Sequence, residues 1–287
     1  MFKSIAKEVW AFDAEWIPDP VAGQLLYDLS ADLSDREIME EMWSRNGATE
    51  ENPTPFLKTV MSRLVSISAV VRKEERDGVK LQLLSLPRDT TNVQELRETS
   101  IIEKFLNGIG KQKPQIVGYN STASDVLILI QRAITNGLSC PGFAKRPDKP
   151  WEGFDYFDSR NSEAHIDMKN ILSSWGKGTP SLNELTVLSG IPGKIDVDGN
   201  QVAEMWLNGG INEIVAYNEF DALSTYLLWL RLAFFGGFFD EDQYLREVEL
   251  TRQLTKDLSK EPGREHLKKY LEHWQNLEEK WQTLHAS

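Results

Sequence analysis

Two acidic residues, Asp13 and Glu15, stand two positions apart at the C-terminal end of a predicted first strand. The strand is expected over residues 8–14 (EVWAFDA), where bulky apolar side chains alternate. Residues two apart on a strand point to the same face, so the two carboxylates converge. Their repulsion, on the order of several kcal/mol, is relieved when a cation lies between them. Asp-x-Glu alone is a weak signal, and a pair of solvated strand-end acids is the alternative.

Two more acids occur in different surroundings. Asp125 follows a short predicted strand at 115–119 and a turn that holds Asn120; taken alone, it is an acid in the first turn of a helix. Asp221 lies four residues after Tyr217 and shares its face of a markedly apolar helix. A carboxylate is costly to bury there unless it is hydrogen-bonded in the core or bound to a metal. The three segments together are far more specific than any one of them.

The elements that must position these residues follow an α/β pattern. A β-branched strand at 64–71 is followed by Asp77-Gly78, which predicts a hairpin turn. Ser-x-x-Glu patterns at Ser100 and Ser181 predict capping boxes that open two helices. Strands with intervening helices and one hairpin indicate an α/β domain with a mixed sheet flanked by helices.

We divide the chain into a domain over residues 1–239 and a C-terminal helical extension over 240–287. Within the domain, the acidic segment 18–56 is interpreted as an insertion over the end of the first strand, a natural place for a lid. The apolar run 222–239 is interpreted as a buried helix that ends at glycines, not as a membrane span. Apolar residues at spacings of three and four predict an amphipathic helix in the extension. That helix either packs on the core or forms a self-association or partner surface.

Composition excludes several classes of protein. Of the 287 residues, 40% are hydrophobic and 26% are charged, as in an ordinary globular protein. The net charge of −12 excludes a basic coat that binds nucleic acid without specificity. The single cysteine, Cys140, excludes an intramolecular disulfide and a multi-cysteine zinc site. Cysteine usage and the lack of a signal-peptide pattern predict a cytoplasmic protein with no membrane partner.

In chain order, Asp-x-Glu, Asn-x4-Asp and Tyr-x3-Asp resemble the motifs of the DEDDy group of DnaQ-like 3′–5′ exonucleases. Finer details resemble the PolB-like branch, and the resemblance covers about residues 8–235. Ala216 stands where the histidine variant of the superfamily has His, which favours the tyrosine variant. Ser124 stands where the family often has Phe, a departure that could loosen packing beside Asp125. The segments that carry the resemblance are FDAEW, GYNSTASD, EAHIDMKNIL, LNELTVLSGIPGK with DGNQV, and YNEFDALSTYLLWLR.

The resemblance implies an RNase H-like fold and a site in which Asp13, Glu15, Asp125 and Asp221 hold two divalent ions. Hard oxygen ligands favour Mg²⁺ or Mn²⁺. Tyr217 is a poor base at an ordinary pKa of about 10, so its implied role is to orient the attacking water.

Other residues near the motifs are candidate substrate contacts. They are Ala14, Trp16, Asn120, Lys145 and Arg146. An aromatic side chain such as Trp16 can stack on a terminal base, but core packing is the alternative; for Lys145 and Arg146 the alternative is a solvated loop. His165 is expected to be structural or on the substrate side, not the catalytic base.

The leading hypothesis is a metal-dependent 3′–5′ exonuclease that acts on single-stranded or frayed DNA ends. The same site working on RNA or short oligonucleotides is the enzymatic alternative, because sugar choice depends on a 2′-hydroxyl contact that the sequence does not reveal. A non-catalytic nucleic-acid-binding scaffold, with segment 18–56 and the C-terminal helix as partner surfaces, is the third hypothesis.

Overall fold

A computed structural model describes residues 1–149, 152–173, 178–195 and 199–285. Five strands form one sheet in the order β3-β2-β1-β4-β5. β1 pairs antiparallel with β2 and parallel with β4, β2 pairs antiparallel with β3, and β4 pairs parallel with β5. The strands are β1 (Glu8–Pro18), β2 (Ser62–Glu75), β3 (Gly78–Leu86), β4 (Gln115–Gly118) and β5 (His165–Asp167).

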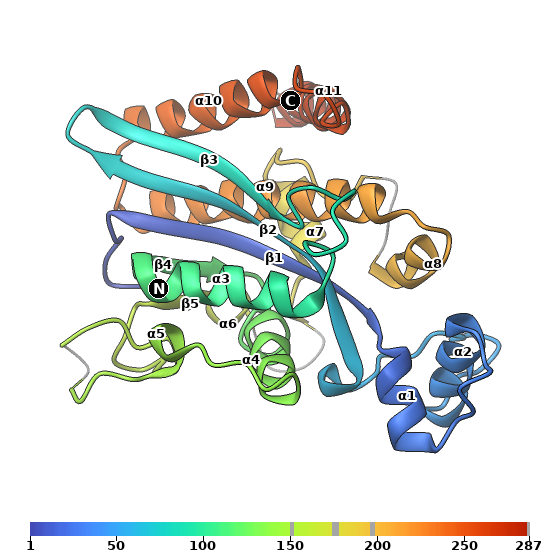
Figure 1. Cartoon of the computed structure of the whole chain (residues 1–287). Helices are drawn as coiled ribbons and strands as arrows, with labels where there is room; N and C mark the ends of the chain where they lie inside the picture. Colours follow the sequence, from blue (N-terminus) through green and yellow to red (C-terminus); the bar gives the residue numbers. More distant parts are fainter. Residues whose placement is uncertain (150–151, 174–177, 196–198, 286–287) are drawn as a thin grey trace.

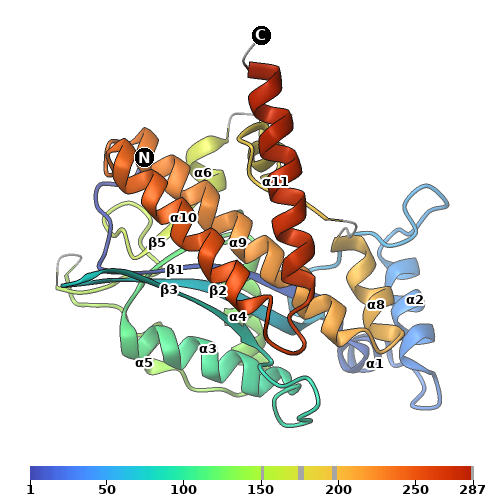
Figure 2. The same cartoon turned by 90° about the horizontal axis from the view of Figure 1, so that it is seen from above.

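Helices cover both faces of the sheet (Figures 1 and 2). One face is covered by α3, α4 and α5, and the other by α9, α10 and α11. The helices are α1 (Pro20–Tyr27), α2 (Asp35–Arg45), α3 (Glu98–Gln112), α4 (Asp125–Thr135), α5 (Pro141–Ala144), α6 (Met168–Leu172), α7 (Leu182–Leu188), α8 (Val202–Leu207), α9 (Ile211–Phe235), α10 (Glu241–Leu258) and α11 (His266–His285). The predicted fold class, an RNase H-like mixed sheet flanked by helices with further helices at the C-terminus, is confirmed.

β1 divides the two cores because its side chains alternate between the faces. Val9 and Ala11 pack towards α9, whereas Trp10 and Phe12 pack towards α3. Asp13 continues the α9 side of this alternation. β4 pairs with β1 only up to Ala11. The part of β1 that carries the first two acids therefore lies beyond the end of β4.

Two local predictions have different outcomes. The capping box at Ser181 is confirmed, because its hydroxyl accepts from the backbone of Glu184 while the Glu184 side chain accepts in return. The capping box at Ser100 is wrong: α3 already begins at Glu98, so Ser100 lies inside the helix. The Glu98 carboxylate accepts instead from the Leu64 N–H and from Arg132. These bonds to distant parts of the chain hold the first turn of α3, and a local sequence pattern does not reveal them.

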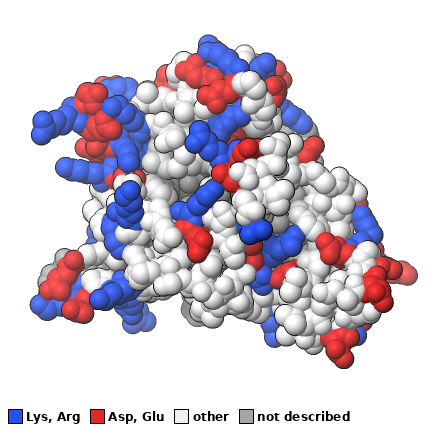
Figure 3. All heavy atoms as spheres, in the orientation of Figure 1, with Lys and Arg blue, Asp and Glu red and all other residues white. Residues whose placement is uncertain are grey.

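The insertion folds as a small helical unit beside the end of β1 (Figure 1). α1 and α2 pack on each other around Ile38 and Met42. Met39 of α2 also joins Tyr217 of α9 in one apolar cluster. On the face shown in Figure 3, acidic side chains gather over this unit, while basic and acidic side chains are interspersed elsewhere. The insertion thus contacts the helix that carries the last motif.

α9 is a buried helix of 25 residues that ends before the glycine pair at 236–237, as predicted for the apolar run. Among the described residues, no helix is long and apolar enough to cross a membrane. α10 and α11 cover α9 and the sheet, and their Tyr244, Tyr270 and Trp274 belong to the same core as Trp229. The prediction of an amphipathic C-terminal helix is confirmed, and its apolar face packs on the core.

An ion pair fixes α10 to the sheet. Arg72 of β2 donates two hydrogen bonds to the Glu247 carboxylate, at 2.8 and 2.7 Å, and Tyr226 of α9 donates a third at 2.9 Å. Arg72 and Glu247 are only 2% and 4% exposed. Each charge therefore depends mainly on its partner, since the other carboxylate near Arg72, that of Glu74, is exposed and lies 3.8 Å away.

We expect Glu247→Gln to lower the free energy of unfolding by about 3–5 kcal/mol, because it leaves the buried Arg72 guanidinium with only the exposed Glu74 carboxylate, 3.8 Å from Nη1, as a counter-charge. Urea denaturation followed by circular dichroism measures this change. Glu204→Gln is the control, since Glu204 pairs with Arg36 at an exposed position and its loss should leave stability unchanged. Equal effects of the two variants would contradict this role of the buried pair.

Candidate metal centre

Three carboxylates from two elements converge on one point. Asp13 and Glu15 of β1 and Asp221 of α9 each offer an oxygen within 4.8 Å of the other two. α9 packs along β1 and β2, and this contact brings residue 221 to residues 13 and 15. The sequence-predicted convergence of the first and third motifs is thus observed among the described residues.

Asp125 approaches this cluster from the opposite side of the sheet. It is the first residue of α4 and is 3% exposed. Its Oδ1 accepts from the backbone N–H of Ala14 at 3.1 Å. That N–H is available because β4 no longer pairs with β1 beyond Ala11. Asp125 is outside the three-residue cluster, but it faces the segment that links Asp13 to Glu15.

Burial and mutual repulsion make the charged state of these acids costly. The pKa of Asp13 is raised well above its ordinary value by burial first and then by the charges of Asp125, Asp221 and Glu15. The pKa of Glu15 is raised for the same reasons, burial first. Burial also raises the pKa of Asp125 and of Asp221 to about 6. Four acids in this state fit a divalent cation, because the donor set consists of hard oxygen atoms that gain a counter-charge on binding.

Tyr217 lies one helical turn before Asp221, and its phenol is near enough to the Asp221 carboxylate to lower the pKa of that acid. The side chain is 4% exposed. Burial, and then the neighbouring carboxylates, raise the pKa of Tyr217 far above its ordinary value. Its phenol is therefore protonated in the metal-free protein.

Sequence reasoning did not identify Asn218, which lies next to Tyr217. Its Nδ2 donates to Asp13 Oδ2 at 2.8 Å, and its Oδ1 accepts from Ser66 Oγ at 2.9 Å. The side chain has no exposed surface, so these bonds satisfy a polar group that would otherwise be costly to bury. The available signal was an amide inside an apolar helix. Asn218 links β2 to Asp13 and fixes the orientation of that carboxylate.

The turn between β4 and α4 has a defined shape. Asn120 adopts a left-handed backbone conformation, with φ of 65°, and its N–H donates to Asp167 Oδ1 at 2.9 Å. A side chain at Gly118 would lie 2.4 Å from Ser121 Cβ, so only glycine permits this close approach. The Asn120 side chain accepts from Lys169 Nζ at 2.9 Å. Asn120 therefore lies in the same turn that leads into Asp125.

The other candidate substrate contacts lie in different places. Ala14 is buried between the two acids of β1, and Trp16 is half-buried against the core on the α3 side. Arg146 follows α5 and donates to Asp155 at 2.8 Å. Lys145, its neighbour, is exposed. Lys194, which was not a candidate, lies near enough to attract the carboxylates of Glu15 and Asp221.

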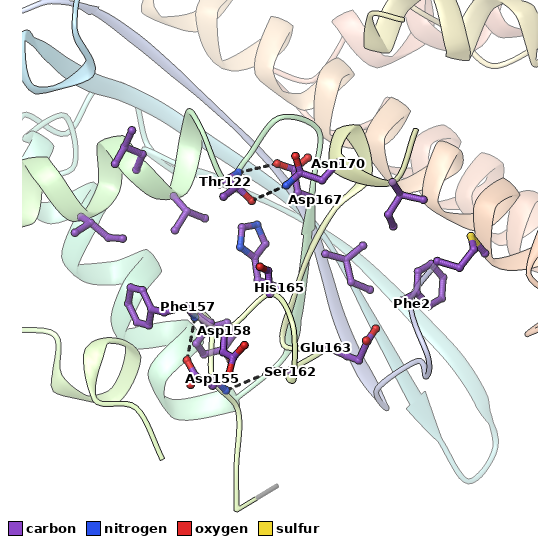
Figure 4. Close-up of a pocket in the computed structure, with 18 residues that line it drawn as sticks. Phe2, Thr122, Asp155, Phe157, Asp158, Ser162, Glu163, His165, Asp167 and Asn170 are labelled. Carbon is purple, nitrogen blue, oxygen red and sulfur yellow. Dashed lines mark hydrogen bonds between the residues drawn. The ribbon is translucent and has the colours of Figure 1, made fainter. Parts of the chain in front are cut away.

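A cavity of about 280 Å³ lies beside the β5 edge, between α4 and residues 155–163 (Figure 4). His165 points into it and its Nε2 lies 2.8 Å from Ser121 Oγ. Burial lowers the pKa of His165 to about 4, so the ring is neutral near pH 7. The lining does not include Asp13, Glu15 or Asp221. His165 therefore contacts the turn at Ser121, from a cavity that these three carboxylates do not line.

The raised pKa values predict how the stability of the metal-free protein depends on pH. The folded forms of Asp125 and Asp221 bind protons up to about pH 6, whereas their ordinary pKa is 3.8. Between these values the folded state holds more protons than the unfolded state, so the free energy of unfolding falls as pH rises through this window. Asp125→Asn should reduce that fall. Urea denaturation in EDTA at several pH values between 4 and 7 tests this.

Asp148→Asn removes an exposed carboxylate and is the matched control. Its free energy of unfolding should depend on pH as that of the unaltered protein does. A pH dependence in Asp125→Asn as steep as in the control would contradict the account of the buried acids.

The sequence profile of a family described as predicted 3′–5′ exonucleases related to the exonuclease domain of PolB matches residues 54–274. The match includes Asp125, Tyr217 and Asp221, whereas Asp13 and Glu15 lie before its first residue. No curated protein sequence matches the chain.

Among solved structures, a family B DNA polymerase from the hyperthermophilic archaeon Pyrobaculum calidifontis matches with 16% identity and a TM-score of 0.47. The match covers 80% of this chain and 25% of the polymerase, so the chain spans about a quarter of that protein. Because the family profile covers most of the sequence, the predicted PolB-like relationship is confirmed: the chain belongs to the family of predicted 3′–5′ exonucleases related to the exonuclease domain of PolB.

Proposed function

We propose that the chain is a DEDDy-type exonuclease that uses two divalent ions, Mg²⁺ or Mn²⁺, to remove nucleotides from the 3′ ends of single-stranded or frayed DNA. The observation that carries this proposal is the convergence of Asp13, Glu15 and Asp221 within 4.8 Å, with Asp125 bonded to the chain between the first two. Family membership supports the reaction class.

The four carboxylates would hold the ions, and their arrangement suits this task. When bound, two such ions would lower the pKa of an attacking water and stabilise the negative charge on the leaving 3′-oxygen. Asn218 and the Ala14 N–H hold Asp13 and Asp125 in fixed orientations. Second-layer bonds of this kind raise metal affinity because the ligands need not reorganise on binding.

Tyr217 adds a neutral phenol to the site, beside the donors that Asn218 and the Ala14 N–H provide. Its phenol stays protonated beside Asp221, and its single proton can turn from that carboxylate to an oxygen on the water or phosphate that enters the site. Asn120 lies in the turn before Asp125, and its Nδ2, which makes only a long bond of 3.4 Å to Ser124 Oγ, would bind the terminal nucleotide. The side chains of this chain thus orient the reactants, while Asp221 and its partners provide the negative charge that a cation requires.

Asp13→Asn and Asp221→Asn should each abolish 3′ trimming. Loss of a ligand removes several kcal/mol of charge stabilisation, which corresponds to a fall of at least about 10³-fold in rate. Shortening of a 5′-labelled single-stranded oligonucleotide in Mg²⁺ or Mn²⁺ measures this, with circular dichroism to verify folding. Glu213→Gln, an exposed acid on the same helix, should retain full activity. Metal-dependent activity in both Asn variants would rule out the proposed site.

Tyr217→Phe should lower kcat by roughly 10–100-fold, because it removes one hydrogen bond to a charged group. The ring remains, so the packing against α2 is preserved. Since the phenol stays protonated, the alkaline limb of the pH–rate profile should be the same in both proteins. Rates between pH 6 and 9 test this, and a shift of the alkaline limb in the variant would assign Tyr217 the role of a base instead.

A further inference from the structure

Both oxygens of Asp125 are held by donors from different parts of the chain. Oδ1 accepts from the Ala14 N–H at 3.1 Å, and Oδ2 accepts from Ser124 Oγ at 2.7 Å. Two donors on separate oxygens fix the plane of a carboxylate as well as its position. A carboxylate has about four lone-pair sites, so each oxygen of Asp125 can still coordinate a cation.

The single proton of Ser124 has two acceptors within reach, at 2.7 Å each: Asp125 Oδ2 and the carbonyl of Asn120. The Asn120 carbonyl already accepts from the N–H groups of Ala123 and Ser124, at 3.1 and 3.0 Å. The carboxylate forms the stronger, charge-assisted bond. The Ser124 proton therefore goes to Asp125.

Ser124 itself is held in place by the turn. Asp167 of β5 accepts from the N–H groups of Asn120 and Thr122, both at 2.9 Å. Ser124 is 8% exposed, so solvent does not compete freely for its hydroxyl. Asp167 of β5 thus fixes the turn, the turn fixes Ser124, and Ser124 fixes the orientation of the Asp125 carboxylate.

We propose that Ser124 is a positioning residue that presets the Asp125 carboxylate for divalent-cation binding. This inference rests on the proposed function and identifies a residue whose hydroxyl is needed for it. Serine at this position does not simply loosen the packing beside Asp125, because its hydroxyl bonds the Asp125 carboxylate directly. Removal of a bond in the second layer of a metal site costs 10–100-fold in metal affinity in typical cases, and we expect a weakening of roughly this size in Ser124→Ala.

Calorimetric titration with Mn²⁺ at fixed pH tests the proposal on the full chain. The variants are Ser124→Ala, Ser124→Thr, which restores the hydroxyl, and Thr122→Val. Thr122 is the matched control, because its hydroxyl lies in the same turn and contacts Asn170 at 3.4 Å rather than a carboxylate. A parallel assay gives the Mn²⁺ concentration that half-activates oligonucleotide hydrolysis and the KM for the oligonucleotide. Thermal melting in EDTA verifies that each variant is folded.

The proposal predicts weaker Mn²⁺ binding and a higher half-activating Mn²⁺ concentration in Ser124→Ala, with KM for the oligonucleotide unchanged at saturating Mn²⁺. Ser124→Thr should recover most of the affinity, and Thr122→Val should bind as the unaltered protein does. Unchanged Mn²⁺ affinity in Ser124→Ala, or an equal loss in Thr122→Val, overturns the role of Ser124 while leaving the proposed function in place. Failure of the unaltered protein to bind Mn²⁺ overturns both.

Discussion

Like-charge repulsion among Asp13, Glu15 and Asp221 is the constraint on which the site depends. Their oxygens lie within 4.8 Å of one another, and burial raises the pKa of all three. A fold gains nothing in stability from such a cluster, so it is expected where a cation supplies the missing charge. Asn218 donates to Asp13, and the Ala14 N–H donates to the neighbouring Asp125. These donors hold the two carboxylates in place but do not neutralise them.

The rest of the fold keeps β1 and α9 in contact against that repulsion. α9 is covered by α10 and α11, whose aromatic side chains share its core. Arg72 and Glu247 join β2 to α10, and Tyr226 of α9 completes the network. On the side opposite Asp221, Glu219 of α9 accepts from Ser85 and pairs with Arg264 and His266. The C-terminal helices therefore stabilise the position of α9, which carries Asp221.

Several elements could be predicted because they depend on local patterns, and the proximity of Asp13, Glu15 and Asp221 agrees with the order of their motifs. Alternation in β1, the hairpin at residues 77–78 and the apolar length of α9 are all short-range signals. Asn218 and Ser124 could not be assigned from such signals, because their roles come from contacts with residues far away in the chain or across a turn. The start of α3 was misplaced for the same reason, since Glu98 is held by Arg132 rather than by a local cap.

The most direct test of the central claim is a crystal soaked with Mn²⁺ and measured for anomalous scattering at the manganese edge. The account predicts two peaks, roughly 3.5–4 Å apart, coordinated by Asp13, Glu15, Asp125 and Asp221. Soaked crystals of Asp221→Asn should show weakened or missing peaks. Absence of anomalous density at this position in the unaltered protein, at a Mn²⁺ concentration that saturates any activity, would contradict the claim that the cluster is a divalent-metal centre.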